Sequence, residues 1–201
     1  MIDSHCHLNF KKLSENFENI INNSKKNNIS SILSINTNPE DFQDHLNLIK
    51  NYNSIYLSYG LHPSNVQSTN QIELQNFDQY CNNEKVIGIG ETGIDLYHSD
   101  QFLKEQTQVF ETHIEASIKH SLPIIIHQRN SEKEIVDILK NFAKYSAVYL
   151  TKDGSLTLPL IGSGAKKGLS VSISIESKGA SFMISLKFDA FLNVIIPEID
   201  M

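Results

Sequence analysis

Short apolar runs alternate with longer amphipathic runs along the first 150 residues, and this alternation restricts the chain to one class of fold. The short runs are rich in β-branched residues, as buried strands tend to be. They cover residues 30–35, 55–59, 86–89, 123–127 and 147–150. Helical spacing of apolar residues is found in 15–27, 41–49, 101–120 and 131–142. Strand followed by helix, repeated, predicts an α/β protein with parallel strands, either a doubly wound sheet or a (β/α) barrel.

Composition is that of a single globular domain spanning residues 1–201. The chain has 17 basic and 23 acidic side chains, and 40% of its residues are hydrophobic. It has no apolar run of about 18 residues that would span a membrane, and its N-terminus does not resemble a signal peptide. We therefore expect a cytoplasmic protein in which Cys6 and Cys81 are free thiols. The net charge of −6 argues against binding nucleic acid through a basic surface alone. It does not argue against a nuclease whose bound metal ions supply positive charge.

The segment 151–201 differs in composition from the rest. Asparagine occurs 19 times in residues 1–150 and once in 151–201. Residues 169–175 alternate between apolar and polar, which predicts a half-buried strand. Two explanations stay open for this divergent tail: a different structural role, or a shifted reading frame.

The first candidate site residues are His5 and His7, at the end of the first apolar element. Side chains at positions i and i+2 of a strand point to the same face. The two imidazoles are therefore presented together, and imidazole is a good ligand for zinc and other divalent metals. Two surface histidines near a mobile terminus would give the same pattern.

Later strands deliver further candidates at their carboxyl ends. Glu91 follows the 86–89 run among glycines, where Gly90 and Gly93 are expected to turn the backbone tightly, and His127 ends the run 123–127. Carboxyl ends of parallel strands meet at one rim, where α/β enzymes keep their catalytic groups.

The same rim should carry two further polar side chains. His62 follows the 55–59 run, and Arg129 lies two residues past His127, from where its guanidinium can reach a phosphate. For Arg129 a solvated loop cation is the alternative interpretation.

Four stretches together resemble the TatD family of metal-dependent deoxyribonucleases, which belongs to the metal-dependent hydrolases with a TIM-type barrel. They are residues 2–8 (IDSHCHL), 60–63 (GLHP), 89–95 (IGETGID) and 123–129 (PIIIHQR). Their order and spacing match the family across residues 1 to about 145. The resemblance implies a (β/α) barrel that hydrolyses phosphodiester bonds in DNA, with RNA as the alternative substrate, often from the 3′ end of single strands. It implies one or two divalent cations (Zn, Mg or Mn). From the sequence we expect no membrane association and infer no obligate protein partner.

The resemblance also assigns roles. His5 and His7 would bind one metal, Glu91 would bridge two metals, and His127 would bind the second. It places His62 and Arg129 near the substrate phosphate and makes Asp95 a supporting residue.

The tail departs from the family pattern. Leu150 stands where the family has a metal-binding histidine, and Asp200 would be the remnant of a catalytic aspartate that binds metal and accepts a proton from water. A full barrel needs about 250 residues, so we expect it to be incomplete at its C-terminal end. Two alternatives stay open: an amidohydrolase-type enzyme acting on a small molecule, and an inactive, truncated relic.

Overall fold

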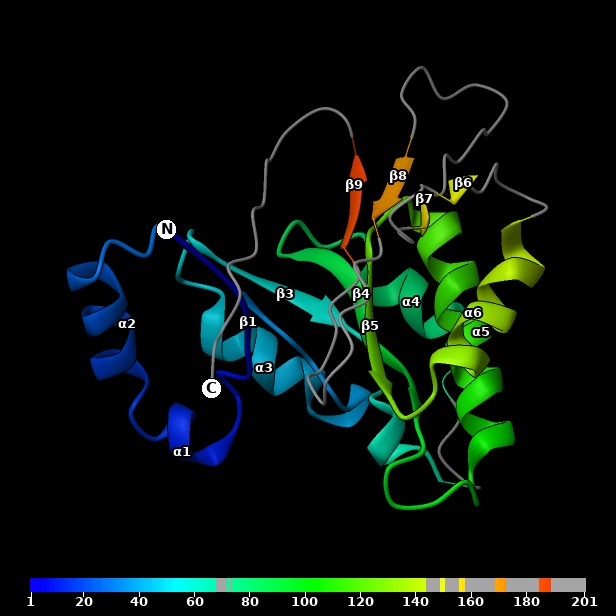
Figure 1. Ribbon diagram of the computed structural model, residues 1–201. Coiled ribbons are helices and arrows are strands. Elements are labelled where there is room, and N and C mark those ends of the chain that lie inside the picture. Colours follow the sequence, from blue (N-terminus) through cyan, green and yellow to red (C-terminus); the bar gives the residue numbers. More distant parts are fainter. Residues whose placement is uncertain are drawn as a thin grey trace.

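The structure is a computed structural model that describes residues 1–67, 72 and 74–143, and the backbone of four short strands beyond them. Its centre is one parallel sheet of five strands in the order β1-β2-β3-β4-β5 (Figure 1). These strands are β1 (Ile2–Cys6), β2 (Ser31–Ser34), β3 (Ile55–Tyr59), β4 (Val86–Asp95) and β5 (Ile124–Arg129). Spatial order equals sequence order, so each strand is added beside its predecessor, as in half of a (β/α) barrel. The predicted α/β fold with parallel strands is confirmed.

Helices connect the strands. They are α1 (Lys11–Ser14), α2 (Phe17–Lys26), α3 (Phe42–Ile49), α4 (Leu74–Tyr80), α5 (Leu103–His120) and α6 (Glu132–Ala143), with 3₁₀ turns η1 (Pro39–Asp41) and η2 (Pro63–Asn65). In Figure 1, α1 and α2 lie beyond β1 on the left, and α4, α5 and α6 lie beside β4 and β5 on the right. No helix in the described ranges has the length and hydropathy of a membrane span.

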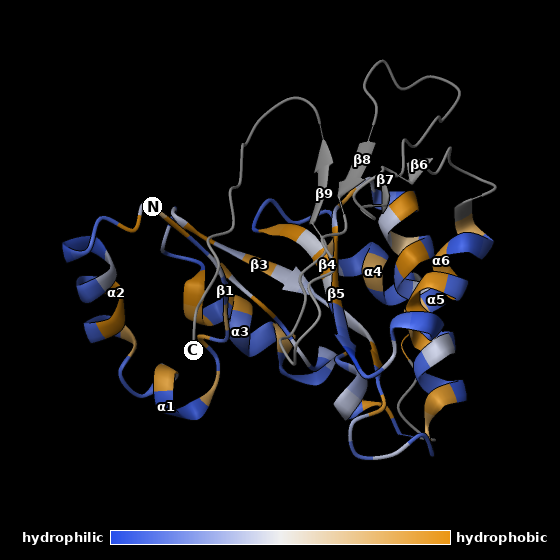
Figure 2. Ribbon diagram, viewed as in Figure 1, coloured by the Kyte–Doolittle hydropathy of each residue, from blue (hydrophilic) through white to orange (hydrophobic). Residues whose placement is uncertain are grey.

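The core lies between the sheet and its helices. Figure 2 shows α3, α5 and α6 with one hydrophobic and one hydrophilic side, the pattern of helices that cover a sheet. Aromatic rings pack edge to face at the centre, with Phe42 and Phe77 each about perpendicular to Tyr59 at ring-centroid distances of 4.8 and 5.3 Å. All three are buried, which anchors α3 and α4 against β3.

Strand β4 is longer than the sequence predicted. The expected tight turn at Gly90 and Gly93 was wrong, because the chain continues as a strand and pairs with β5 as far as Asp95. Gly90 and Gly93 have φ values of +126° and +140°, and the register of β4 against β5 shifts between Ile89 and Thr92. The glycines therefore make an irregular stretch within the strand.

The tail contributes four short strands whose backbone is described. β6 (Tyr149–Leu150) pairs antiparallel with β7 (Leu156–Thr157), and β8 (Leu169–Ser172) pairs antiparallel with β9 (Ser185–Phe188). The run 147–150 was expected to be a parallel strand, but its described residues form this antiparallel pair instead. Asp200 and the side chain of Leu150 lie outside the described residues.

Candidate metal centre

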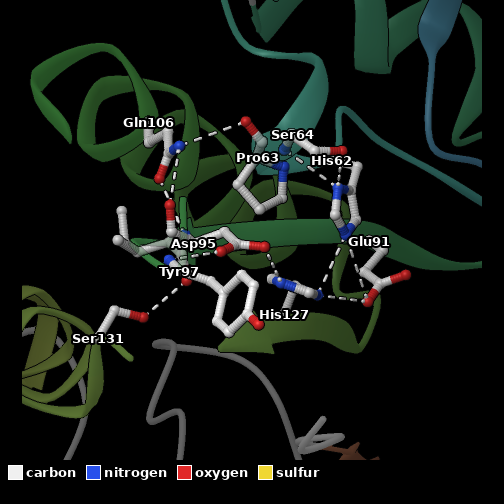
Figure 3. Close-up of polar contacts among 10 residues, drawn as sticks. His62, Pro63, Ser64, Glu91, Asp95, Tyr97, Gln106, His127 and Ser131 are labelled. Carbon is white, nitrogen blue, oxygen red and sulfur yellow. Dashed lines mark hydrogen bonds and ion pairs between the residues drawn. The ribbon is translucent and has the colours of Figure 1, made fainter. Parts of the chain in front are cut away.

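Side chains from three strands and one turn gather at the carboxyl end of the sheet. His5 lies on β1, Glu91 on β4 and His127 on β5, while His62 comes from the turn after β3. Figure 3 shows His62, Glu91 and His127 pointing toward one another, with Asp95 on the other side of the His127 ring. The structure thus brings together six of the residues selected from sequence: His5, His7, His62, Glu91, Asp95 and His127.

Glu91 is the centre of this group. Its carboxylate lies 3.4 Å from His5 Nε2 through one oxygen and 3.2 Å from His127 Nδ1 through the other. Two sets of three potential ligands share it, His5 with His7 and His62 with His127, and the ligand atoms within each set lie within 4.8 Å of one another. Imidazole nitrogens converging on a buried carboxylate suit a divalent transition metal, so the donor chemistry fits two cations that share one carboxylate.

Hydrogen bonds fix which nitrogen of His7 and His127 faces the centre. His7 Nδ1 donates to the carbonyl of Ile35 at 3.0 Å, which leaves the Nε2 lone pair for the site. His127 Nε2 lies 3.0 Å from Asp95 Oδ2, which leaves Nδ1 facing Glu91. Such outer partners orient metal-binding imidazoles.

His62 differs from His7 in that its ring proton is on the nitrogen that faces the centre. Its Nδ1 accepts from the backbone N–H of Ser64 at 3.1 Å and also meets the Ser64 hydroxyl at 2.7 Å. The ring proton is therefore on Nε2, which lies 3.1 Å from His127 Nδ1. Burial lowers the pKa of His62 to about 4, more than the neighbouring carboxylates raise it. At neutral pH His62 is uncharged and offers the centre a donor N–H rather than a lone pair.

The charges of the cluster are coupled. Burial alone would raise the pKa of Glu91, but hydrogen bonds from His127 and His5 and the charge of nearby imidazoles hold it well below its usual range. Burial would lower the pKa of His127, yet its bonds to Glu91 and Asp95 raise it. Glu91 is thus a fixed anion, and the cluster favours positive charge around it.

Close backbone packing positions these strands. A Cβ on Gly60 would lie 2.5 Å from Gly90 Cα, and one on Gly93 would overlap the carbonyl oxygen of His127. At positive φ, Gly90 and Gly93 also have a conformation that other residues rarely adopt. Only glycine allows the three strands to approach so closely beside Glu91.

Arg129 lies at the same end of β5 and pairs in register with Asp95 of β4. Its guanidinium carbon lies 3.4 Å from the ring centroid of Tyr97, and its side chain is exposed.

Sequence reasoning missed two contributors. Ser64 acts through His62, and a serine two residues after a histidine at a turn was the available signal. His113 is buried in the core, and its Nε2 accepts from the N–H of Leu61, beside His62.

Comparison with protein families matches residues 2–179 to the family described as TatD related DNase. The chain belongs to this family. The TatD match extends beyond residue 145, where the resemblance of motifs ends.

Individual relatives agree with this assignment. An uncharacterized metal-dependent hydrolase of Buchnera aphidicola subsp. Baizongia pistaciae is 40% identical over 143 residues, which are 70% of this chain and 54% of the relative. YabD of Bacillus subtilis, another metal-dependent hydrolase, is 31% identical over 141 residues, 70% of this chain and 55% of YabD. The crystal structure of YjjV, a TatD homologue from Escherichia coli K12, superposes with a TM-score of 0.65 at 27% identity, covering 70% of this chain and 55% of YjjV. The chain spans about half the length of the curated relatives it matches.

Proposed function

We propose that the protein is a divalent-metal-dependent phosphodiesterase that hydrolyses DNA, a TatD-type deoxyribonuclease. The main support is the position of Glu91, whose two oxygens face two different sets of imidazoles. A carboxylate shared in this way is suited to hold two cations close together, an arrangement that stabilises both the attacking and the leaving oxygen of a phosphodiester.

His5, His7 and Glu91 would hold one cation, and Glu91 and His127 the other. When bound, such cations polarise a phosphoryl oxygen and make water a strong nucleophile near neutral pH. Asp95 keeps the His127 ring in place through the 3.0 Å contact with Nε2. Asp200 stays a prediction as a further ligand and as the acceptor of the water proton.

His62 and Arg129 are proposed to bind the substrate phosphate. The Nε2–H of His62 points into the centre, where it can donate a hydrogen bond to the phosphate. Because this ring is neutral, it adds no positive charge beside the metal ions. Arg129, exposed at the end of β5, supplies a planar pair of N–H donors suited to phosphate.

We further propose single-stranded DNA as the substrate, shortened from the 3′ end, with Zn, Mg or Mn as the metal and the cytoplasm as the compartment. RNA is the alternative substrate. Cys6 and Cys81 form no disulfide, which agrees with a reducing compartment.

Hydrolysis of labelled single strands tests the proposal. The metal-loaded protein should shorten a 5′-labelled strand stepwise, with release of the label in the first step from a 3′-labelled strand. Glu91→Gln, which keeps the shape of the side chain, should be inactive, and Lys133→Gln on the exposed face of α6 serves as the control. Hydrolysis of simple amides or esters without cleavage of DNA would support the amidohydrolase alternative, and inactivity with every metal would contradict an enzymatic role.

A further inference from the structure

Two exposed aromatic side chains stand beside the proposed metal centre. Large hydrophobic side chains exposed within the described residues are Met1, Phe10, Ile87, Tyr97 and Ile118. The two aromatic ones both follow the carboxyl end of a strand of the parallel sheet, Phe10 after β1 and Tyr97 after β4. Their exposed fractions are 48% and 53%. Exposed aromatic residues at a site rim, rather than scattered over the surface, indicate a binding role.

Phe10 packs against the first set of potential ligands, His5, His7 and Glu91. Its ring stacks on the His7 ring with a centroid distance of 4.6 Å and an interplanar angle of 11°. His7 covers one face of Phe10, and nearly half of the side chain remains accessible. A flat ring can therefore continue this stack beside the centre.

Tyr97 is linked to the second set by hydrogen bonds through Asp95. Its backbone N–H donates to Asp95, the carboxylate that contacts His127, and Figure 3 shows the three residues in one cluster. The Arg129 guanidinium stacks on its ring at 3.4 Å. An aromatic ring with a guanidinium plane on it is a surface on which a nucleobase can stack.

We propose that Phe10 and Tyr97, the latter with Arg129, are stacking sites for unpaired nucleobases of a single strand whose phosphate lies at the centre between them. This inference rests on the proposed function and adds to it a means of recognising single strands. Stacking needs a free base face, which a duplex does not offer. It also needs no positive surface, which matters for a chain with a net charge of −6.

Binding without hydrolysis tests the stacking sites. A fluorescently labelled single-stranded DNA is titrated with the full chain in EDTA, so that the measured Kd does not depend on catalysis. Stacking on one aromatic side chain is worth about 5- to 150-fold in affinity. We expect Phe10→Leu and Tyr97→Leu each to weaken binding by at least about 5-fold, because leucine keeps apolar bulk but has no ring face. Tyr97→Phe, which keeps the ring, should bind the strand as tightly as wild type.

An abasic strand of the same length separates stacking from backbone contacts. Wild-type protein should bind the abasic strand as weakly as a variant carrying both Phe10→Leu and Tyr97→Leu binds the strand with bases. Ile87→Ala, an exposed apolar residue at the opposite end of β4, is the matched control and should bind normally. Equal affinity of wild type for both strands, or normal binding by both leucine variants, would overturn the inference. Base-dependent binding by a protein that cleaves no DNA with added metal would instead contradict the proposed function alone.

Discussion

Replacing His113 with leucine should remove a hydrogen bond that holds the chain next to His62. The His113 ring is fully buried, its Nδ1–H donates to the carbonyl of Val109 at 2.7 Å, and its Nε2 accepts from the N–H of Leu61 at 3.0 Å. Leucine keeps an apolar group against Phe77, whose ring centroid lies 4.9 Å away, but provides no acceptor. The variant thus leaves the buried N–H of Leu61 without its partner.

The expected loss follows from that one orphaned donor. An unsatisfied buried N–H costs about 1–3 kcal/mol, so His113→Leu should lower the free energy of unfolding by that amount at pH 7.5. For a chain of this size this corresponds to a decrease in Tm of about 2–12 °C. His113→Gln keeps an acceptor and should lose less.

The pH dependence makes the test sharper. Burial lowers the pKa of His113 to about 4, despite the opposing bond to Val109, whereas an unfolded histidine titrates near 6.5. As pH falls below 6.5 the unfolded state takes up the proton first, so wild-type stability decreases until about pH 4. For His113 alone, the free energy of unfolding should fall by about 2 kcal/mol between pH 6.5 and 5. His113→Leu lacks this loss, so its deficit should shrink or vanish at pH 5.

Urea unfolding followed by circular dichroism, in a chelating buffer at pH 7.5 and 5, measures both quantities. The chelator prevents metal binding from adding to stability. The reasoning would be refuted by a deficit that is the same at the two pH values, or by wild-type stability for the variant at pH 7.5.

Three further substitutions probe the centre itself. Glu91→Gln should lose both metals in elemental analysis while keeping its circular dichroism spectrum, since the shared charge is removed but the shape of the side chain is kept. Unchanged metal content would show that Glu91 is not the carboxylate shared by the two metals. Gly93→Ala should destabilise by about 3 kcal/mol or more, because the methyl would overlap the His127 carbonyl at a positive φ. Gly88→Ala is its control and should stay within about 1 kcal/mol in thermal melts, since the one close contact of its methyl would be the Ile125 Cδ1 methyl at 3.2 Å, and its next contact lies at 3.6 Å. Asp95→Asn should weaken metal affinity by about 10- to 100-fold in a competition titration with a chelator; wild-type affinity would remove Asp95 from its supporting role.

The position of the centre was predictable from sequence because it depends on strand ends. Glu91 follows a short β-branched run, His127 ends another and His5 lies on the first strand, and parallel strands bring such ends together whatever the packing around them. Strand β3 was expected at 55–59 and is found at Ile55–Tyr59. Local pattern and general topology were sufficient for these features.

Proton positions and strand register were not predictable in the same way. The orientation of His62 depends on Ser64, and that of His7 on the carbonyl of Ile35, which is 28 residues away. The contact of Asp95 with His127 requires β4 to extend to Asp95 and to pair residue by residue with β5. The glycines that make this pairing possible have the same sequence signature as a turn, since both need positive φ. Only the tertiary structure distinguishes the two.

The glycine contacts between strands have a consequence for how the protein tolerates change. The main chain at Gly60 packs directly on that of Gly90, and the main chain at Gly93 packs on that of His127. The spacing of the donor atoms is therefore set by the backbone and not by core side chains. Swapping core residues such as Leu57 or Ile126 for others of similar size should therefore alter melting temperature with little effect on metal affinity. Random mutagenesis under selection for metal binding should therefore leave the apolar core positions variable, while these glycines stay as unchanged as the metal-holding residues themselves.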